Sequence, residues 1–339
     1  MDKSTVYLTK IDKMRENLLL GLEFIGWKDI VKTDSTVFLK PNFTYPYHKK
    51  GITTTPELLE EFLYLLKGRA RRVIIGESDG GNHSFSADDS FAGHNIPEIC
   101  KKTGAEYVNL SNMPSLELTE RIQGKDVMVR LPNLLLREID CMISVPVLKV
   151  HVMTGVSLSM KNLWGCYPDT MRCLHHKDLD RKLALITKLT KPRLIVIDGS
   201  YALDNHGPMY GSPKKTDLLI LSNNPVAVDM IGSMIMGIPL HRARHIMVAE
   251  GEGLGPTNLR QIKMNDGWEE FRMQFSVRRT FLDRASLLLF KSEFLARLVM
   301  DSSMSPLIYG VASHLRNSSE AEVVNDLERY CERKKNDNQ

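Results

Sequence analysis

The fold of this chain is decided by residues 141–165, which read CMISVPVLKVHVMTGVSLSMKNLWG. The segment opens with an apolar run over Cys141–Leu148, which predicts a buried strand. Lys149 and His151 follow two residues apart, so both side chains leave the same face of the extended chain. In open α/β sheets, ligands bind at the carboxyl ends of such strands. The segment therefore predicts an α/β fold with a site at one edge of its sheet.

Strand and helix patterns alternate on both sides of this segment. Strands separated by helices indicate βαβ units and a mostly parallel sheet. The arm Ile122–Arg130, folded around Gly124, predicts a hairpin and therefore a mixed sheet. The other predicted strands are Thr36–Leu39, Arg72–Ile75, Tyr107–Leu110, Leu194–Ile197 and Leu218–Leu221, and the predicted helices are Pro56–Lys67, Ile96–Thr103 and Pro225–Met236.

The length of 339 residues exceeds that of a single ordinary core, so we expect a two-lobed α/β protein. An N-terminal α/β lobe is placed at residues 1–130. A second α/β lobe, residues 131–258, carries the Lys-x-His and Lys-Asn motifs. From residue 259 to residue 339 the chain is rich in Leu, Phe, Met and Arg at helical spacing and then becomes polar, which predicts a helical C-terminal extension.

The composition is that of a folded protein, with 42% apolar and 25% charged residues. A formal net charge of +4 over this length is too small for the concentrated basic face of a nucleic-acid binder. The five cysteines are odd in number and scattered, which indicates free thiols in a reducing compartment. We find no secretory signal and no long apolar span, and we expect a cytoplasmic protein.

Three basic side chains after the central strand are the first candidates for catalysis. Lys149, His151 and the later Lys161 are polar groups that follow a buried strand within a short stretch of chain. A histidine with an ordinary pKa of about 6.5 can move protons near neutral pH. The alternative is that the lysines are solvated and His151 is a loop residue, and we favour the site because three such groups converge.

Polar residues also follow the other predicted strands. Glu77 and Asp79 come directly after Arg72–Ile75, and carboxylates at such a position orient a lysine, bind a metal or accept a proton. Asp79-Gly80 is equally typical of a plain turn. We predict a catalytic role for Asp79 and substrate binding by Glu77. Lys40 and Asn42, after Thr36–Leu39, and Asn162, beside Lys161, complete the predicted substrate-binding set.

The stretch Cys166–His176 holds four residues of types that ligate metals. His175 and His176 are the candidate metal ligands, but the spacing matches neither a structural zinc site nor an iron–sulfur motif. A loop with thiols is the preferred interpretation, and the cofactor is left open, with a metal ion as one alternative.

Five motifs in order along the chain resemble the domain-of-unknown-function family 362 (DUF362). They are LKPNF at 39–43, ESDGG at 77–81, VPVLKVH with MKNLWG within 145–165, IDGSYALDNHGPMYG at 197–211 and NPVAVD at 224–229. Many members of this family carry an appended cysteine-rich, ferredoxin-like module. This chain has no such cluster motif.

The order of His151, Lys161 and His175 or His176 is also similar, more distantly, to that in nickel-pincer lactate racemases. This resemblance implies a two-lobed architecture with an interlobe cleft. It also implies a catalytic histidine, a lysine that anchors the pincer cofactor and a metal-ligating histidine. His83 and His94 are the candidates for a second catalytic histidine.

We therefore expect an enzyme that acts on a small anionic substrate, a carboxylate or a phosphate ester, by lysine and histidine acid–base chemistry. Its reaction would be of an isomerase, racemase or lyase type. The alternatives are a nickel-pincer racemase built on the same residues and a non-catalytic binding or electron-transfer accessory protein.

The segment Thr280–Met300 has apolar residues at helical spacing, including Phe281, Leu288 and Leu295, and predicts one amphipathic helix. Most such helices pack on a core, and this is the reading we prefer. The arginines and phenylalanines on the same segment also fit a helix that lies on a membrane surface.

Overall fold

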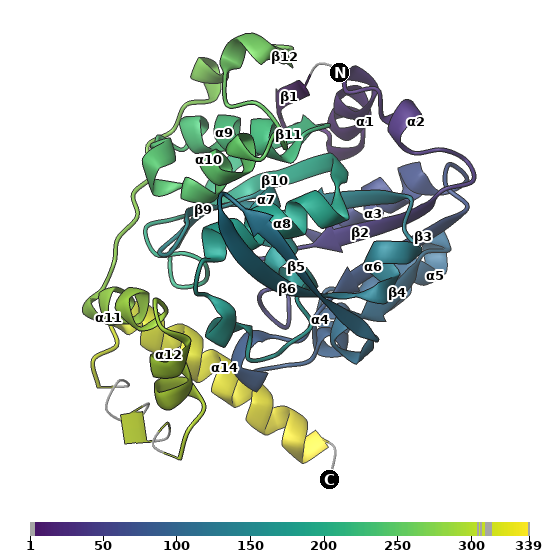
Figure 1. Cartoon of the computed structure of the whole chain (residues 1–339). Helices are drawn as coiled ribbons and strands as arrows, with labels where there is room; N and C mark the ends of the chain where they lie inside the picture. Colours follow the sequence, from purple (N-terminus) through teal and green to yellow (C-terminus); the bar gives the residue numbers. More distant parts are fainter. Residues whose placement is uncertain (1–3, 304, 306, 309–313, 338–339) are drawn as a thin grey trace.

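The computed structural model describes residues 4–303, 305, 307–308 and 314–337 of the chain. A mixed β-sheet forms its centre, and helices cover both faces of the sheet (Figure 1). The predicted α/β class, with a mostly parallel or mixed sheet and a helical C-terminal region, is confirmed.

The main sheet has ten strands, and eight of them run in the order β12-β1-β11-β10-β7-β2-β3-β4. The strands β10, β7, β2, β3 and β4 are parallel neighbours, whereas β11 is antiparallel to both β1 and β10. The short strand β8 continues beside β10 and pairs with β9. The bounds are β1 Ser4–Lys10, β2 Thr36–Pro41, β3 Arg72–Glu77, β4 Glu106–Asn109, β7 Cys141–Val145, β8 Val147–His151, β9 Gly155–Ser157, β10 Pro192–Asp204, β11 Ser212–Ser222 and β12 Ile262–Met264.

The two faces of the sheet bury two separate hydrophobic cores. On β2, Phe38 faces one core, and its neighbours Val37 and Leu39 face the other. This period of two is what a strand covered on both faces requires. One face is covered by α1 (Met14–Phe24), α3 (Pro56–Leu66) and α5 (Ile96–Thr103), and the other by α6 (Asn133–Arg137), α7 (Ser159–Asn162), α8 (Leu179–Thr190), α9 (Pro225–Ile235) and α10 (Arg244–Gly251).

Local sequence accounts for the start of one helix and for a break between two strands. Helix α9 starts after Asn224, whose side chain accepts hydrogen bonds from the backbone N–H groups of Val226 and Ala227. The predicted hairpin is present as β5 (Ser115–Ile122) and β6 (Lys125–Pro132), a separate two-stranded sheet. The single strand predicted over Cys141–Leu148 is divided at Pro146 into β7 and β8.

The division predicted at residue 130 does not coincide with a break in the sheet. Strand β2, from the segment 1–130, pairs with β7, from the segment 131–258. Strand β12, from the segment 259–339, pairs with β1. All three segments therefore contribute to one continuous sheet.

The C-terminal extension differs from the prediction of one helix over Thr280–Met300. Two helices are present instead, α11 (Phe281–Leu289) and α12 (Glu293–Met300), and Ser292 caps the second by accepting a hydrogen bond from the N–H of Leu295. Helix α11 has no buried residue, and α12 buries only Ala296. The two helices pack only lightly on the core, through the buried Ala296 and the ring contact of Phe290 with His176. The choice between a core-packing and a membrane-surface segment stays a prediction. Residues 304, 306, 309–313, 338 and 339 of the extension lie outside the described residues.

The last helix, α14 (Ser318–Asp337), returns along the α/β core (Figure 1). Its Asp326 carboxylate accepts hydrogen bonds of 2.6 Å from the hydroxyls of Tyr45 and Tyr47 and from the Lys49 amine. This single carboxylate therefore fastens α14 to the loop that follows β2. Two short α-helices, α2 (Trp27–Ile30) and α4 (Ala87–Gly93), also belong to the described part of the chain.

Within the described part of the chain, no helix combines the length and the apolar character that crossing a bilayer requires.

Candidate functional site

A cavity of about 200 Å³ lies at the carboxyl ends of β2, β3 and β8. Lys40 enters it from β2, Glu77 from the last position of β3 and His151 from the last position of β8. The short helix α7 contributes Lys161 and Asn162. Asn42, which follows β2, lines the cavity as well. The chain thus brings together six of the residues that the sequence selected, at the edge of the sheet where α/β proteins bind ligands.

A buried ion pair forms one side of this cavity. Lys40 Nζ lies 2.5 Å from Glu77 Oε2, and the two side chains are 1% and 6% exposed. The amine also donates to the carbonyl of Pro41, and the carboxylate accepts from the backbone N–H groups of Phe43 and Ser78. Buried charges persist when they are paired and hydrogen-bonded in this way. The pair therefore fixes the ends of β2 and β3 relative to one another.

Gly165, the last residue of the MKNLWG motif, lies directly against this pair. A Cβ atom at that position would be 2.4 Å from Glu77 Oε1 and 2.8 Å from Lys40 Nζ. Only a residue without a side chain lets the backbone approach the pair this closely. The glycine is explained by this contact.

A chain of side-chain hydrogen bonds leads from the ion pair to Lys149. Asn162 Nδ2 donates to the Lys40 carbonyl at 3.0 Å, and Asn42 Nδ2 donates to Asn162 Oδ1 at 3.2 Å. Lys149 Nζ donates to Asn42 Oδ1 at 3.0 Å and to the Ile52 carbonyl at 2.9 Å. Lys149 has no exposed surface and does not line the cavity. It lies behind the wall and holds Asn42 in place.

His151 lines the cavity as a neutral ring. Its Nδ1 accepts a hydrogen bond of 3.1 Å from the N–H of Met153, so the single proton of the neutral imidazole is on Nε2. Burial and the nearby charge of Lys161 hold the pKa of His151 well below its ordinary value. In this tautomer His151 offers a ligand an N–H donor rather than a basic nitrogen.

Lys161 presents a basic group to the cavity. Its side chain is partly exposed at the cavity wall, and no described residue forms a hydrogen bond or ion pair with its amine. Burial, followed by the charges of Arg172 and Lys40, lowers the pKa of Lys161 to about 7. A large fraction of this amine is therefore neutral at neutral pH, which lets it accept a proton.

Arg172 is a cavity residue that the sequence did not indicate. It lies in a 3-10 turn after the motif, where no periodic pattern marks it. Its guanidinium donates to Ser78 Oγ at 3.0 Å and to the carbonyls of Tyr167 and Asp79. These partners are neutral, so its positive charge is not balanced by a carboxylate contact.

A buried carboxylate on the neighbouring helix positions α7. Asp229, from the NPVAVD motif on α9, accepts hydrogen bonds of 2.8 and 2.9 Å from the N–H groups of Ser159 and Met160. Burial raises the pKa of Asp229 to about 7. Because these N–H groups begin α7, Asp229 sets the direction in which Lys161 and Asn162 point. It is a positioning residue outside the cavity.

Asp79, expected to be catalytic, is not brought to the cavity. Its Oδ1 accepts hydrogen bonds of 2.8 Å from the Ala87 N–H and from Asn109 Nδ2. The side chain fixes the start of α4 and the end of β4. Asp79 therefore has a structural role, but it is not the plain turn that the Asp-Gly pair also predicted, because residues 78–80 form no turn.

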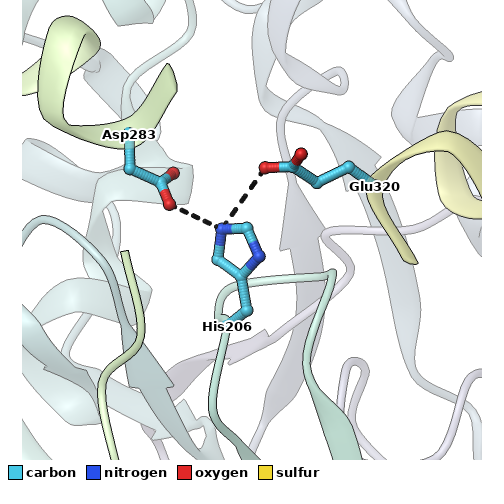
Figure 2. Close-up of side chains that lie close together, drawn as sticks. All are labelled: His206, Asp283 and Glu320. Carbon is cyan, nitrogen blue, oxygen red and sulfur yellow. Dashed lines mark ion pairs between the residues drawn. The ribbon is translucent and has the colours of Figure 1, made fainter. Parts of the chain in front are cut away.

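His175 and His176, the candidate metal ligands, have other environments. His175 Nε2 lies 3.0 Å from Asp169 Oδ2, and His176 packs its ring against Trp164 and Phe290. Neither lines the cavity. In the described part of the chain, one group of three metal-ligating side chains converges, and it consists of His206, Asp283 and Glu320 (Figure 2).

These features define an α/β protein with a cationic cavity at the carboxyl ends of its parallel strands. The chain belongs to the family described as domain of unknown function DUF362, whose profile matches residues 37–234. The matched range contains every cavity residue named above, from Lys40 to Arg172.

Two known proteins are similar over much of the chain. A thylakoid-associated protein of Synechocystis sp. is 25% identical over 246 residues, which are 68% of this chain and 72% of that protein. A structural-genomics crystal structure of a Thermotoga maritima protein aligns with a TM-score of 0.39 and 10% identity. That alignment covers 72% of this chain and 60% of the other.

The close approach at Gly165 yields a stability prediction. Gly165→Ala should destabilise the protein by about 1–3 kcal/mol, because the added methyl group forces the buried pair apart. Urea unfolding measures this. Gly81→Ala is the matched control, since a Cβ at Gly81 meets no atom within 4 Å, and it should change stability little. Equal losses of stability in Gly165→Ala and Gly81→Ala would contradict the conclusion that contact with the ion pair requires a glycine at position 165.

Lys149 and Lys161, the two lysines whose pKa falls to about 7, should make stability depend on pH. Both pKa values fall from 10.5 to about 7. Between these values the unfolded chain binds more protons than the folded chain, so the free energy of unfolding should rise with pH from 7 toward 10. Lys161→Met should flatten this rise and leave stability at pH 7 unchanged or higher, because its amine loses no protein partner.

Lys149→Met is the comparison. It should also flatten the rise but should lose about 1–3 kcal/mol, because Asn42 Oδ1 and the Ile52 carbonyl each lose a donor. Urea unfolding at pH 7, 8 and 9 separates the two variants. If the free energy of unfolding rises with pH as steeply in Lys161→Met as in the wild type, the Lys161 amine keeps its ordinary pKa.

Proposed function

We propose that the cavity binds a small anion and that the protein is an enzyme acting on a substrate that bears a carboxylate or a phosphate. The observation that carries this proposal is the Lys161 amine, which faces the cavity without a protein partner and has a pKa lowered to about 7 by burial and by neighbouring cations. An amine in this state favours any ligand that brings negative charge.

The charges around the cavity support an anionic ligand. Lys40, Lys161 and Arg172 line it, against the single carboxylate of Glu77, which is already paired with Lys40. A bound anion would offset the excess positive charge. It would also raise the pKa of Lys161, so binding above pH 7 should be accompanied by proton uptake.

The arrangement suggests a division of roles. Arg172 and Lys40 attract the anion, and Nε2–H of His151 donates a hydrogen bond to a substrate oxygen. Neutral Lys161 accepts a proton from the substrate and becomes an ammonium, while the substrate keeps the electron pair. Return of that proton to the other face of the carbon gives an isomer, and loss of a leaving group gives a lyase product.

The nickel-pincer alternative fits these residues less well. A pincer site needs a metal-ligating histidine beside the anchoring lysine, and His151 is the one histidine in the described lining of the cavity. The neutral tautomer of His151 carries its proton on Nε2, and Nδ1 already accepts from Met153. We therefore derive no step through this cofactor. A binding protein without turnover remains the other alternative.

Proton exchange in D2O tests the proposed chemistry. The full chain, incubated with a panel of 2-hydroxy, 2-oxo, amino and phospho acids, should incorporate deuterium at the carbon next to the carboxylate of its substrate. Lys161→Met should reduce the exchange rate at least a hundredfold, a size typical of losing a general base. His151→Gln should retain part of the rate, since a glutamine amide can still donate.

Two other results would redirect the proposal. Binding of an acid, seen by calorimetry, without exchange or product would support the binding-protein alternative. An adduct on Lys161 together with nickel, seen by intact mass and elemental analysis, would support the pincer alternative.

A second proposal concerns association with an anionic membrane surface. The segment α11–α12 leaves Phe281 76% exposed, Leu288 64% exposed and Phe294 74% exposed. Exposed cations lie on both helices and between them: Arg284 on α11, Arg297 on α12 and Lys291 in the link. Short helices with exposed aromatic and aliphatic side chains among cations are typical of interfacial binding. The Synechocystis relative is named for its thylakoid association, which favours the same role, whereas the cytoplasmic location stays a prediction.

Vesicle co-sedimentation tests the membrane proposal. The full chain should bind vesicles with a large fraction of phosphatidylglycerol more strongly than purely zwitterionic ones. Phe281→Asp and Phe294→Asp should each weaken this binding at least fivefold. Leu20→Asp, at a leucine 58% exposed on α1, is the matched control and should bind normally. No sedimentation with either vesicle, or a concentration-dependent dimer that these aspartates disrupt, would overturn the proposal.

A further inference from the structure

We propose that His206, Asp283 and Glu320 bind a divalent transition-metal ion of the Zn²⁺ type and that this ion fastens the C-terminal extension to the α/β core. The three side chains come from distant parts of the chain and converge on one point (Figure 2). His206 follows β10, Asp283 lies in the first turn of α11, and Glu320 lies in the first turn of α14.

The separations between the donor atoms suit one ion. His206 Nε2 lies 2.8 Å from Asp283 Oδ2 and 3.7 Å from Glu320 Oε1. Ligand atoms about 2.0–2.1 Å from a tetrahedral Zn²⁺ are roughly 3.3 Å from one another, and the two separations lie on either side of this value. Imidazole nitrogen and carboxylate oxygen are both ligands of such ions, and three protein ligands leave a position that water can fill.

The imidazole nitrogen is not otherwise satisfied. The His206 side chain is 8% exposed, and its Nε2 makes no hydrogen bond of normal direction to any described residue, although Asp283 is close. Figure 2 shows both carboxylates approaching the same nitrogen from different sides. A ring nitrogen holds at most one proton, so it cannot serve both oxygens. A cation between the three atoms satisfies all of them.

The local charge also favours a divalent ion. The side chains of Asp283 and Glu320 are 13% and 7% exposed, so two negative charges are brought together away from water. Protonated His206 would leave this group with a net charge of −1, whereas neutral His206 with a divalent ion gives zero. Buried charges are tolerated when they are balanced or coordinate a metal.

Other residues already hold the carboxylates in place. Asp283 Oδ2 accepts from the Thr280 N–H at 2.7 Å, and Glu320 Oε1 accepts from Thr280 Oγ1 at 3.2 Å. Glu320 Oε2 accepts from the Asn317 N–H at 2.9 Å. Such outer hydrogen bonds orient the ligands of metal sites. They also place both ligands at helix starts, where carboxylates are favoured.

The site has a consequence for the cavity. Pro208 and Met209, next to His206 in the chain, line the cavity, and so does Leu327 on α14. A metal ion held by His206 and Glu320 would fix both of these wall segments together. The proposal does not depend on what the cavity binds.

Metal titration of the full chain tests this site. Protein stripped with EDTA should bind one equivalent of Zn²⁺ and, with Co²⁺, should develop the visible absorption of a low-symmetry nitrogen–oxygen site. Zn²⁺ should raise the melting temperature of the wild type. Glu320→Gln and His206→Ala should each weaken Zn²⁺ binding at least tenfold and remove the thermal shift. His241→Ala, at an exposed histidine outside the group, should behave as the wild type.

Glu320→Gln limits the risk of misfolding, because it keeps the size of the side chain and its amide oxygen can still accept from one of the two donors, Thr280 Oγ1 or the Asn317 N–H. Failure of the wild type to bind Zn²⁺ or Co²⁺ at micromolar concentration would overturn the proposal. Binding that Glu320→Gln and His206→Ala leave unchanged would overturn it equally. Neither result bears on the anion-binding cavity.

Discussion

A buried lysine–glutamate pair at the ends of two parallel strands is the constraint on which the cavity depends. Lys40 and Glu77 join β2 to β3 at the point where both strands end, and Gly165 brings the backbone after α7 against them. Removing either charge would leave the other buried and unpaired, which typically costs about 3–5 kcal/mol. The pair thus fixes the cavity wall. It also engages Glu77, which is the one carboxylate in the described lining of the cavity.

The result is an excess of basic side chains over carboxylates in the described lining of the cavity. Arg172 is held by carbonyl and hydroxyl oxygens, and Lys161 has no described partner. Asp229 holds the start of α7, so that Lys161 is directed by a helix rather than by a loop. The proposal of an anionic ligand rests on this arrangement, because a ligand of negative charge would balance it. The geometry thereby connects the MKNLWG and NPVAVD motifs to the same wall of the cavity.

The sequence alone located the strand ends and most of the cavity residues, because apolar runs and the spacing of apolar residues are local signals. It placed Lys149 and His151 on one face of the strand. It could not tell that the Lys161 amine faces the cavity whereas the Lys149 amine lies behind the wall, because the position of Lys149 depends on its hydrogen bond to Asn42. It missed Arg172, which lies in a turn without periodicity, and it assigned Asp79 to catalysis although its contacts are to α4 and β4. Apolar spacing also concealed the break at Ser292, although a serine cap was visible there.

The ionisation of Lys161 tests the central claim most directly. NMR of the full chain with ¹³C-labelled lysine, with the signal assigned by its absence in Lys161→Met, reports the pKa of this amine. The account predicts a pKa near 7 in the free protein, compared with 10.5 for an ordinary lysine, and a rise of at least one unit when inorganic phosphate or a small carboxylate binds. An amine that titrates near 10 and does not respond to either anion would contradict it.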